Sequence, residues 1–416
     1  MEKIYVFADF DWLKCPELIG ELGFENIRGS ESYNFSFADS WLKEHPDIFL
    51  SHDINNYSGV QYTMPGKNIF GCFSDALPDR WGRILINRRE QILATEENRP
   101  ARKLFSFDYL KSIDDFSRIG GFRFKTDLNG DYINASNELR IPPLSDIREL
   151  TAAANDIERT EEKNIAPERK WLRQLVNPGS SLGGARPKAN VVDTDGKLYV
   201  AKFPSRNDSY DVELWEYFCN ILGKNAGVNV ANTRIIKVGD KHALLSRRFD
   251  RTNENQRIHF ASAMTLLGLS DGDNASTGHG YLDIVDFITQ NCCDVEANLA
   301  ELFRRIAFSI CVGNSDDHFR NHGFLLTAKG WTLSPAYDIN PSDNEYQSLL
   351  INETSDIADL QILLDAHKSY LLNKETAESI INEVKQWMNR WRSVASYLQI
   401  PKSEWKRFEN RFDRWT

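Results

Sequence analysis

The sequence lacks long apolar runs, paired cysteines and a surplus of positive charge, and each absence excludes a class of protein. No stretch approaches the roughly eighteen consecutive apolar residues that a membrane-spanning helix requires. The N-terminus has neither the longer apolar segment nor the small-residue cleavage site of a signal peptide. We therefore expect a cytoplasmic protein that does not associate with membranes.

Cysteine usage and net charge exclude two further classes. The six cysteines show no CxxC spacing and most have apolar neighbours, which predicts buried free thiols in a reducing compartment. The formal charge of −10 argues against a chain built chiefly to hold nucleic acid, because neutralising phosphates requires clustered lysine and arginine. Any contact with DNA would then depend on a partner that brings a local basic patch to it.

What the sequence does contain indicates a folded protein of several domains. Its 416 residues exceed one ordinary core, and the 41% hydrophobic fraction is typical of globular chains. A Pro-Pro stop and a helix that starts at Ser145 place a first boundary near residue 150. The predicted domains are an N-terminal domain of strands and helices (1–150), a β-rich layer (151–252) and a helical layer (253–416).

Local signals predict several elements within these layers. Pro78 and Asp79 favour a helix start, and two glycine-containing turns, at 194–196 and 239–240, each separate two apolar strands and predict hairpins. Helical periodicity is clearest at 298–313, where one face would carry Leu299, Leu302, Phe303, Ile306, Ala307 and Ile310, and it recurs at 375–398.

The stretch "SSLGGARPKANVV" (Ser180 to Val192) is the first candidate site. Two adjacent glycines before a strand allow backbone N–H groups to approach an anion closely. The Walker pattern GxxxxGK[ST] is absent, so this is not a P-loop. A glycine turn that simply leads into a hairpin remains an alternative.

Lys202, in "LYVAKF", is the second candidate. It shares one face of a predicted strand with Leu198 and Val200, so its ammonium would project from an apolar row. In a phosphoryl-transfer enzyme such a lysine pairs with nucleotide phosphates and is oriented by an acid on the next helix, here Glu216 or Glu213. A lysine that snorkels at a sheet edge is the alternative.

The third candidate is "GNSDDHFRNHGFLL" (Gly313 to Leu326), taken together with "WTLSPAYDINP". Asp316 and Asn321 have the D-x4-N spacing at which a kinase loop holds its base and a metal-binding amide. Asp338 follows a short predicted hairpin, where a second carboxylate for magnesium would lie. Phosphoryl transfer needs these groups because Mg²⁺ bridges phosphate oxygens while a carboxylate receives the hydroxyl proton.

A zinc site and a plain surface loop are the alternatives for this stretch. His318 and His322 would be four residues apart on a helix, a spacing that suits zinc, but HExxH is absent and no third ligand is evident. The ordinary polarity of a surface loop would also account for acids and amides here. It does not account for acids that recur between apolar strands in the order found in kinases.

The three stretches together resemble the HipA-type serine/threonine kinases, the toxins of bacterial toxin–antitoxin pairs. "SLGGARPKA", "AKF", "RRFDR", "NSDDHFRNHGF" and "LSPAYDINP" occur in that family's order, and "FSDALPDRWGR" (Phe73 to Arg83) resembles the signature of its N-terminal domain. The resemblance implies an α+β, two-lobed protein-kinase-like fold, with a β-rich N-lobe and a helical C-lobe, preceded by an α/β N-terminal subdomain.

The resemblance also implies roles for individual residues. Asp316 resembles the catalytic base, His318 a phosphate-side or loop-ordering group, and Asn321 and Asp338 the Mg²⁺ ligands. "SRRF" resembles the hinge strand beside adenine, with the departure that Arg247 stands where the family often has an acid. The implied ATP-binding residues are Ser181, Leu182, Gly183, Gly184, Lys202, Glu216, Arg248, Phe249 and His318.

Ser181 matches the family's autophosphorylated serine. A phosphate there would compete, through its charge and volume, for amides that otherwise face ATP, and would switch the enzyme off. Ser180 is an adjacent alternative acceptor, and both residues could equally be ordinary turn serines.

The function implied is an ATP- and Mg²⁺-dependent protein kinase toxin. The family implies a small helix-turn-helix antitoxin of the HipB type as partner, operator DNA reached only through that antitoxin, and a protein substrate such as an aminoacyl-tRNA synthetase. A non-catalytic kinase-fold corepressor that bridges antitoxin dimers on DNA is the main alternative, and a small-molecule kinase of the aminoglycoside or lipid type is another.

Overall fold

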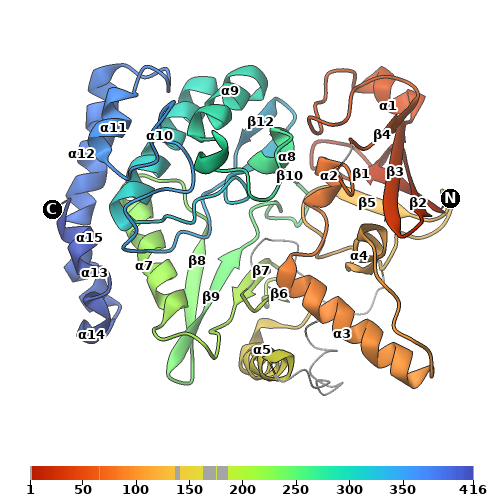
Figure 1. The fold of residues 1–416 in the computed structure, drawn as a ribbon, viewed down its shortest axis with the longest axis horizontal. Coiled ribbons are helices and arrows are strands. Elements are labelled where there is room, and N and C mark those ends of the chain that lie inside the picture. The colour runs from red at the N-terminus through yellow and green to blue at the C-terminus, as the bar shows by residue number, and fades with distance from the viewer. Residues whose placement is uncertain (1, 65, 136–140, 163–174, 176–185, 416) are drawn as a thin grey trace. The chain divides into compact units, whose positions relative to one another are not determined.

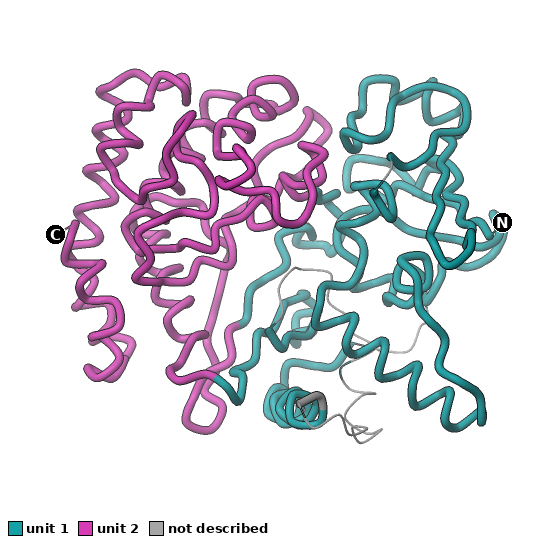
Figure 2. Tube along the Cα trace, in the orientation of Figure 1, with its two compact units in different colours: residues 1–207, 245–261 teal, residues 208–244, 262–416 magenta. Residues whose placement is uncertain are grey.

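The computed structural model describes residues 2–64, 66–135, 141–162, 175 and 186–415. The chain divides into two compact units (Figure 2). Unit 1 comprises Met1–Asn207 and Leu245–Ala261, and unit 2 comprises Asp208–Leu244 and Ser262–Thr416. Within the described residues, no helix is both long and apolar enough to cross a membrane.

Unit 1 begins with a twisted antiparallel sheet of order β4-β3-β2-β1-β5 (Figure 1). Alternate residues of β1 are fully buried, because successive side chains point to opposite faces of a strand. β2 and β3 are joined by the two residues Arg28 and Gly29, both with positive φ, as a type I′ hairpin turn requires. The strands are β1 (Glu2–Ala8), β2 (Glu17–Ile27), β3 (Ser30–Phe37), β4 (Val60–Tyr62) and β5 (Phe122–Lys125).

The helices of unit 1 follow the signals in the sequence closely. The α3 helix starts as predicted, since the Asp79 carboxylate accepts a hydrogen bond from the Gly82 backbone N–H at 2.7 Å. The helix predicted from Ser145 begins with a 3₁₀ turn and becomes α-helical at Ile147. The helices are α1 (Asp39–Glu44), α2 (Gly71–Ser74), α3 (Arg80–Glu96), α4 (Ser106–Ser112), η1 (Leu144–Asp146) and α5 (Ile147–Glu162).

Both predicted hairpins are confirmed. β6 (Lys188–Val192) pairs antiparallel with β7 (Leu198–Lys202), and Gly196 in their turn has a φ of +76°. β8 (Thr233–Val238) and β9 (Lys241–Arg247) flank Gly239, and the four strands have the order β6-β7-β9-β8.

The predicted division at residues 150 and 252 differs from the two units, because buried ion pairs connect distant parts of the chain. Asp250 forms two 2.6 Å contacts with Arg248 and also accepts a hydrogen bond from the Gly120 backbone N–H at 2.8 Å. Arg251 donates to the carbonyl of Arg118 at 2.6 Å. These contacts join the segment after β9 to the loop before β5, so β6, β7 and the segment from Leu245 to Ala261 belong to the same unit as the predicted N-terminal domain, whereas β8 and the first part of β9 belong to unit 2.

A buried histidine in unit 1 predicts sensitivity of folding to acid. His259 is 2% exposed, its ring lies 4.2 Å from Phe122 and 5.0 Å from Phe10, and burial lowers its pKa to about 3. The unfolded chain takes up a proton below pH 6.5 that the folded chain does not, so stability falls as pH drops from about 6.5 toward 3. In urea unfolding, we expect the free energy of unfolding of wild type to fall by about 2 kcal/mol more than that of His259→Asn when the pH is lowered from 7.5 to 5.

The asparagine variant is the matched control, because its side-chain oxygen can still accept from the Gly121 N–H that lies 3.4 Å from His259 Nδ1. Asparagine has no proton to gain in this range. Equal losses in the two proteins would contradict the prediction.

Unit 2 is mainly helical, with α10 packed against α9, α11 and α12 (Figure 1). The predicted face of α10, from Leu299 to Ile310, is confirmed, since all six side chains are at most 1% exposed. The single helix predicted at 375–398 is two helices, α12 and α13, which are separated at Asn389 and Arg390. β10 (His259–Ser262), most of which belongs to unit 1, forms a sheet with β11 (Gly323–Thr327) and β12 (Gly330–Leu333), in that order. The helices are α7 (Val212–Asn225), α8 (Ala263–Leu266), η2 (Ala275–Thr277), α9 (Tyr281–Asn291), α10 (Val295–Val312), α11 (Leu360–Asp365), α12 (Lys374–Met388), α13 (Trp391–Tyr397), α14 (Lys402–Trp405) and α15 (Glu409–Asp413).

The six cysteines are free thiols, as predicted. Cys72, Cys219 and Cys311 are buried, and burial raises the pKa of each thiol. Cys15 is exposed, because it lies in the turn between β1 and β2 rather than in a core element.

Candidate functional site

The acidic loop predicted as the site runs from the end of α10 to the start of β11, within unit 2. Gly313 ends α10 with a φ of +73°, and a Cβ at this position would lie 2.1 Å from the carbonyl oxygen of Ser342. Glycine is therefore required here both by backbone conformation and by space. The hydroxyl of Ser342 donates to the Gly313 carbonyl at 2.6 Å, which fixes the start of the loop.

The loop turns tightly and brings Asp316 and Asn321 together. The Asn321 backbone N–H donates to the His318 carbonyl at 2.8 Å, and its side-chain amide donates to the Asp316 carbonyl at 3.0 Å. The Asp316 side chain is 88% exposed, and its Oδ1 lies 3.9 Å from His318 Nε2. The D-x4-N spacing thus forms one closed turn whose carboxylate projects into solvent and whose amide is held by the backbone.

Asp338 adopts a backbone conformation that is unusual for a residue other than glycine, with a φ of +60°. Two asparagines hold it there. The Asn340 side chain donates to Asp338 Oδ1 at 3.1 Å, and the Asn340 backbone N–H donates to Asn314 Oδ1 at 3.2 Å. A left-handed residue over-determined by its neighbours is typical of functional sites. Neither asparagine was assigned a role from the sequence, although both lie in motifs that it singles out.

The electrostatics of the loop place Asp316 beside other carboxylates. Desolvation by the surrounding loop raises the pKa of Asp316 although its side-chain surface is exposed, His318 lowers the pKa, and the negative charges of Asp338 and Asp317 raise it further. The net pKa is above the ordinary value. The loop therefore concentrates negative charge that a bound cation would stabilise.

Asp317, to which the sequence analysis gives no role, is buried, whereas the neighbouring Asp316 is exposed. Its side chain is 7% exposed, its Oδ2 accepts a hydrogen bond from the Tyr281 hydroxyl at 2.8 Å, and its Oδ1 lies 3.1 Å from His322 Nε2. His322 is thus engaged by a carboxylate. The described residues contain no group of three or more histidine, cysteine or acidic side chains that could hold a metal ion, so nothing in them supports the zinc alternative.

The predicted residues outside this loop lie on several elements. Lys202 is half-buried at the end of β7 in unit 1, opposite Lys188 of β6. Glu213 and Glu216 are both buried on α7, in unit 2, so a pairing of either with Lys202 stays a prediction. Ser180, Ser181, Leu182, Gly183 and Gly184 lie outside the described residues.

The predicted hinge residues Arg248 and Phe249 follow β9 directly. The Arg248 side chain is buried and donates to Asp250, to the Ser117 carbonyl and to the Asn190 side chain. Phe249 is half-buried, with its ring centre 6.0 Å from that of Phe260. Because the guanidinium of Arg248 is occupied, a contact from Arg248 to a nucleotide would have to use its backbone groups.

The donor set of the loop fits a magnesium ion. Mg²⁺ prefers oxygen ligands and is usually held by one or two carboxylates together with substrate phosphates. Asp338 supplies a carboxylate, and Asn321 retains its amide oxygen because its N–H group is bonded to Asp316.

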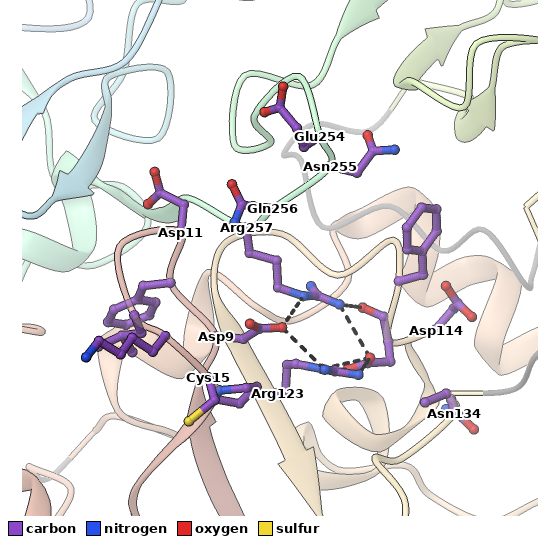
Figure 3. Close-up of a pocket in the computed structure, with 17 residues that line it drawn as sticks. Asp9, Asp11, Cys15, Asp114, Arg123, Asn134, Glu254, Asn255, Gln256 and Arg257 are labelled. Atoms are coloured by element: carbon purple, nitrogen blue, oxygen red, sulfur yellow. Dashed lines mark hydrogen bonds and ion pairs between the residues drawn. The ribbon is translucent and has the colours of Figure 1, made fainter.

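A separate pocket of about 480 Å³ lies in unit 1, between the turn after β1 and the loops before and after β5 (Figure 3). Arg123 bonds Asp115 at 2.6 Å and Asp9 at 3.3 Å, and Arg257 lies 3.4 Å from both acids. Burial alone would raise the pKa of Asp115, but Arg257 and Arg123 outweigh this and hold it below its usual range. Both guanidinium groups are therefore balanced by carboxylates of the same pocket.

Comparison with known proteins identifies the family. The HipA-like C-terminal domain matches residues 180–391, slightly more than half of the chain, and this segment contains every residue predicted above for nucleotide, metal or catalysis. The chain belongs to the HipA-like C-terminal domain family. The match includes the loop from Gly313 to Gly323 and the strand that carries Lys202.

Similar proteins extend this assignment. The serine/threonine-protein kinase toxin HipA of Shewanella oneidensis is 27% identical over 207 residues, which cover 44% of this chain and 47% of that protein. A Haemophilus influenzae protein is 25% identical over 221 residues, which cover 46% of this chain and 64% of the relative. The chain thus matches about half to two thirds of the length of these relatives.

A solved structure shows the shared fold. HipA of Shewanella oneidensis, solved with HipB and its operator DNA, has a TM-score of 0.64 to this chain at 17% identity. The likeness covers 99% of this chain and 95% of the other. The predicted α+β, kinase-like fold is confirmed.

Proposed function

We propose that this protein is an ATP- and Mg²⁺-dependent serine/threonine protein kinase that acts as the toxin of a toxin–antitoxin pair. The observation that carries the proposal is the loop after α10. There an exposed Asp316 carboxylate projects from a turn that Asn321 closes, beside an Asp338 held in a left-handed conformation. Membership of the HipA-like family and the name of the Shewanella relative support the same activity.

In the proposed reaction, Asp316 accepts the proton from a serine hydroxyl of the protein substrate. The serine oxygen forms a bond to the γ-phosphorus of ATP, the bond from that phosphorus to the bridging oxygen breaks, and ADP leaves. Asn321 and Asp338 would hold Mg²⁺, which neutralises the charge on the phosphate oxygens when it is bound. Lys202 would pair with the nucleotide phosphates, and Glu216 would orient it.

The proposal extends to partners and regulation. The solved HipA relative is bound to HipB and operator DNA, which supports a helix-turn-helix antitoxin as the partner here, with DNA contacted through that antitoxin. We propose a protein substrate, an aminoacyl-tRNA synthetase being the family's example. Phosphorylation of Ser181 would inactivate the enzyme by adding charge to the glycine-containing stretch.

The test is to incubate the purified chain with γ-labelled ATP and Mg²⁺. We expect label to appear on the chain, chiefly on Ser181, and to be abolished by chelation of the metal. ATP with Mg²⁺ should also raise the melting temperature, because a ligand that binds only the folded state stabilises it. If neither label nor stabilisation is observed, the proposal is contradicted and the non-catalytic corepressor is favoured.

A lysine variant sharpens this test. We expect Lys202→Ala to raise the KM for ATP more than it lowers kcat, because the lysine would act mainly on the nucleotide phosphates. Lys237→Ala is the matched control, since Lys237 is an exposed lysine on β8 of the same sheet. If the KM for ATP is unchanged in Lys202→Ala, Lys202 does not bind the nucleotide phosphates.

A further inference from the structure

Neighbouring acids in the loop have opposite environments. Asp316 is 88% exposed, whereas the side chain of Asp317 is 7% exposed. Because the two residues share a peptide unit, fixing the direction of one side chain constrains the direction of the other. The contacts of Asp317 therefore bear directly on Asp316.

Asp317 is held at both carboxylate oxygens by groups from different parts of unit 2. Tyr281, the first residue of α9, donates its hydroxyl to Oδ2 at 2.8 Å, and His322, the residue before β11, lies 3.1 Å from Oδ1. The Tyr281 and His322 rings meet edge to face with their centres 5.6 Å apart. Counted over the whole residue, backbone included, each of the three is at most 5% exposed, so water does not compete for these contacts.

The loop backbone is also anchored on both sides of Asn321. The Ala263 N–H donates to the His322 carbonyl at 2.7 Å, and the Met264 N–H lies 3.3 Å from the Phe319 carbonyl. These anchors fix the backbone path of the loop. The Asp316 carbonyl is held by the Asn321 side-chain amide at 3.0 Å, and the Asp317 side chain adds a buried contact at the next residue.

We infer that Asp317, Tyr281 and His322 form a positioning unit that sets the direction of the Asp316 carboxylate. The unit joins the turn to the start of α9 and to the start of β11, so that Asp316 projects from a rigid support. The catalytic consequence rests on the proposed function, but the rigidity of the loop does not.

A buried carboxylate also has an ordinary structural role, and the variants separate the two. Asp317→Ala removes both contacts. Asp317→Asn keeps the side-chain volume. It can also keep both contacts, because its oxygen can accept from Tyr281 and its N–H group can donate to a neutral imidazole. Tyr281→Phe removes only the hydroxyl and leaves the ring in place.

The experiment measures steady-state phosphoryl transfer and backbone hydrogen exchange in the full-length chain. We expect Asp317→Ala to lower kcat by about 100-fold with little change in the KM for ATP, because a small misplacement of a catalytic group costs this much. Tyr281→Phe should lower kcat less, and Asp317→Asn should recover most of it. Amides of residues 315–321 should exchange faster in Asp317→Ala and Tyr281→Phe, and those in α10 should not.

Two substitutions serve as controls. Asp286→Asn changes an exposed acid on α9, and Tyr397→Phe removes the hydroxyl of a tyrosine that is 81% exposed, so neither should alter kcat or exchange. The inference is overturned if Asp317→Ala keeps kcat within about twofold of wild type and loop exchange is unchanged. If Asp317→Ala does not fold, kcat and loop hydrogen exchange in Tyr281→Phe are used instead, and the inference is overturned if both are unchanged.

Failure of the proposed function would look different. A wild-type chain that transfers no phosphate refutes the kinase, and loop exchange in Tyr281→Phe and Asp317→Ala still reports whether the unit holds the turn. Transfer by wild type with full activity in the variants refutes only the positioning unit.

Discussion

Replacing Asp316 by asparagine is expected to slow phosphoryl transfer by about 10³-fold while leaving the fold intact. General-base groups typically contribute about 10² to 10⁴ in rate, and asparagine cannot accept the proton from the substrate hydroxyl. The Asp316 side chain is 88% exposed and its contact with His318 is long, at 3.9 Å, so little stability depends on it. Single-turnover assays with γ-labelled ATP measure the rate, and thermal unfolding measures the fold.

Asp365→Asn is the matched control for this prediction. Asp365 is an exposed acid at the end of α11 in the same unit, and its carboxylate accepts a hydrogen bond from the neighbouring Gln361 at 2.8 Å. The control should retain full activity. If Asp316→Asn retained more than about a tenth of the wild-type rate, another group would have to be the base.

Replacing Asp250 by asparagine is expected to destabilise the chain by about 3–5 kcal/mol. Asp250 is 1% exposed, contacts Arg248 and Arg251 at 2.6–2.7 Å, and accepts from the Gly120 N–H. Removing its charge leaves two buried guanidinium groups without a counter-ion, and breaking a buried pair in this way costs about that much. Urea unfolding at pH 7 measures the loss.

The pH dependence of this effect checks its cause. Burial would raise the pKa of Asp250, but Arg248 and Arg251 outweigh it and hold the pKa well below its usual range. A depressed carboxyl stabilises the fold above its unfolded pKa of about 3.9, and this contribution is lost as pH falls further. The difference in the free energy of unfolding between wild type and Asp250→Asn should therefore become smaller as the pH falls below about 3.9. Asp131 is an exposed acid of unit 1, and Asp131→Asn should have the same free energy of unfolding as wild type at every pH.

Much of the site was accessible from the sequence because its chemistry is local. The spacing of Asp316 and Asn321 is short enough for one turn to close, and the structure forms that turn with a hydrogen bond between them. The orientation of Asp317 was not predictable, because its partner Tyr281 lies 36 residues away. The φ of +60° at Asp338 was also not predicted, since aspartate adopts a left-handed conformation at only a minority of positions and the contact from Asn340 becomes visible only in the structure.

The predicted domain boundaries differ from the bounds of the two compact units for a related reason. Composition changes near residues 150 and 252, but Arg248 and Asp250 bond to residues 117–120, about 130 positions away in the chain. Arg248 illustrates the same limit at the level of one residue. A nucleotide contact by Arg248 stays a prediction, and nothing in the sequence indicated that its buried guanidinium joins strands and loops of unit 1.

The close approach at Gly313 has a consequence for natural variation and for laboratory selection. Alanine is the smallest possible replacement, yet its methyl group would collide with a backbone oxygen rather than with a side chain that can move aside. Such a collision shifts the chain at residue 342 and with it the segment that begins at Asp338. A library randomised at position 313 and screened for folded protein should return glycine almost alone, even though this residue carries no reactive group.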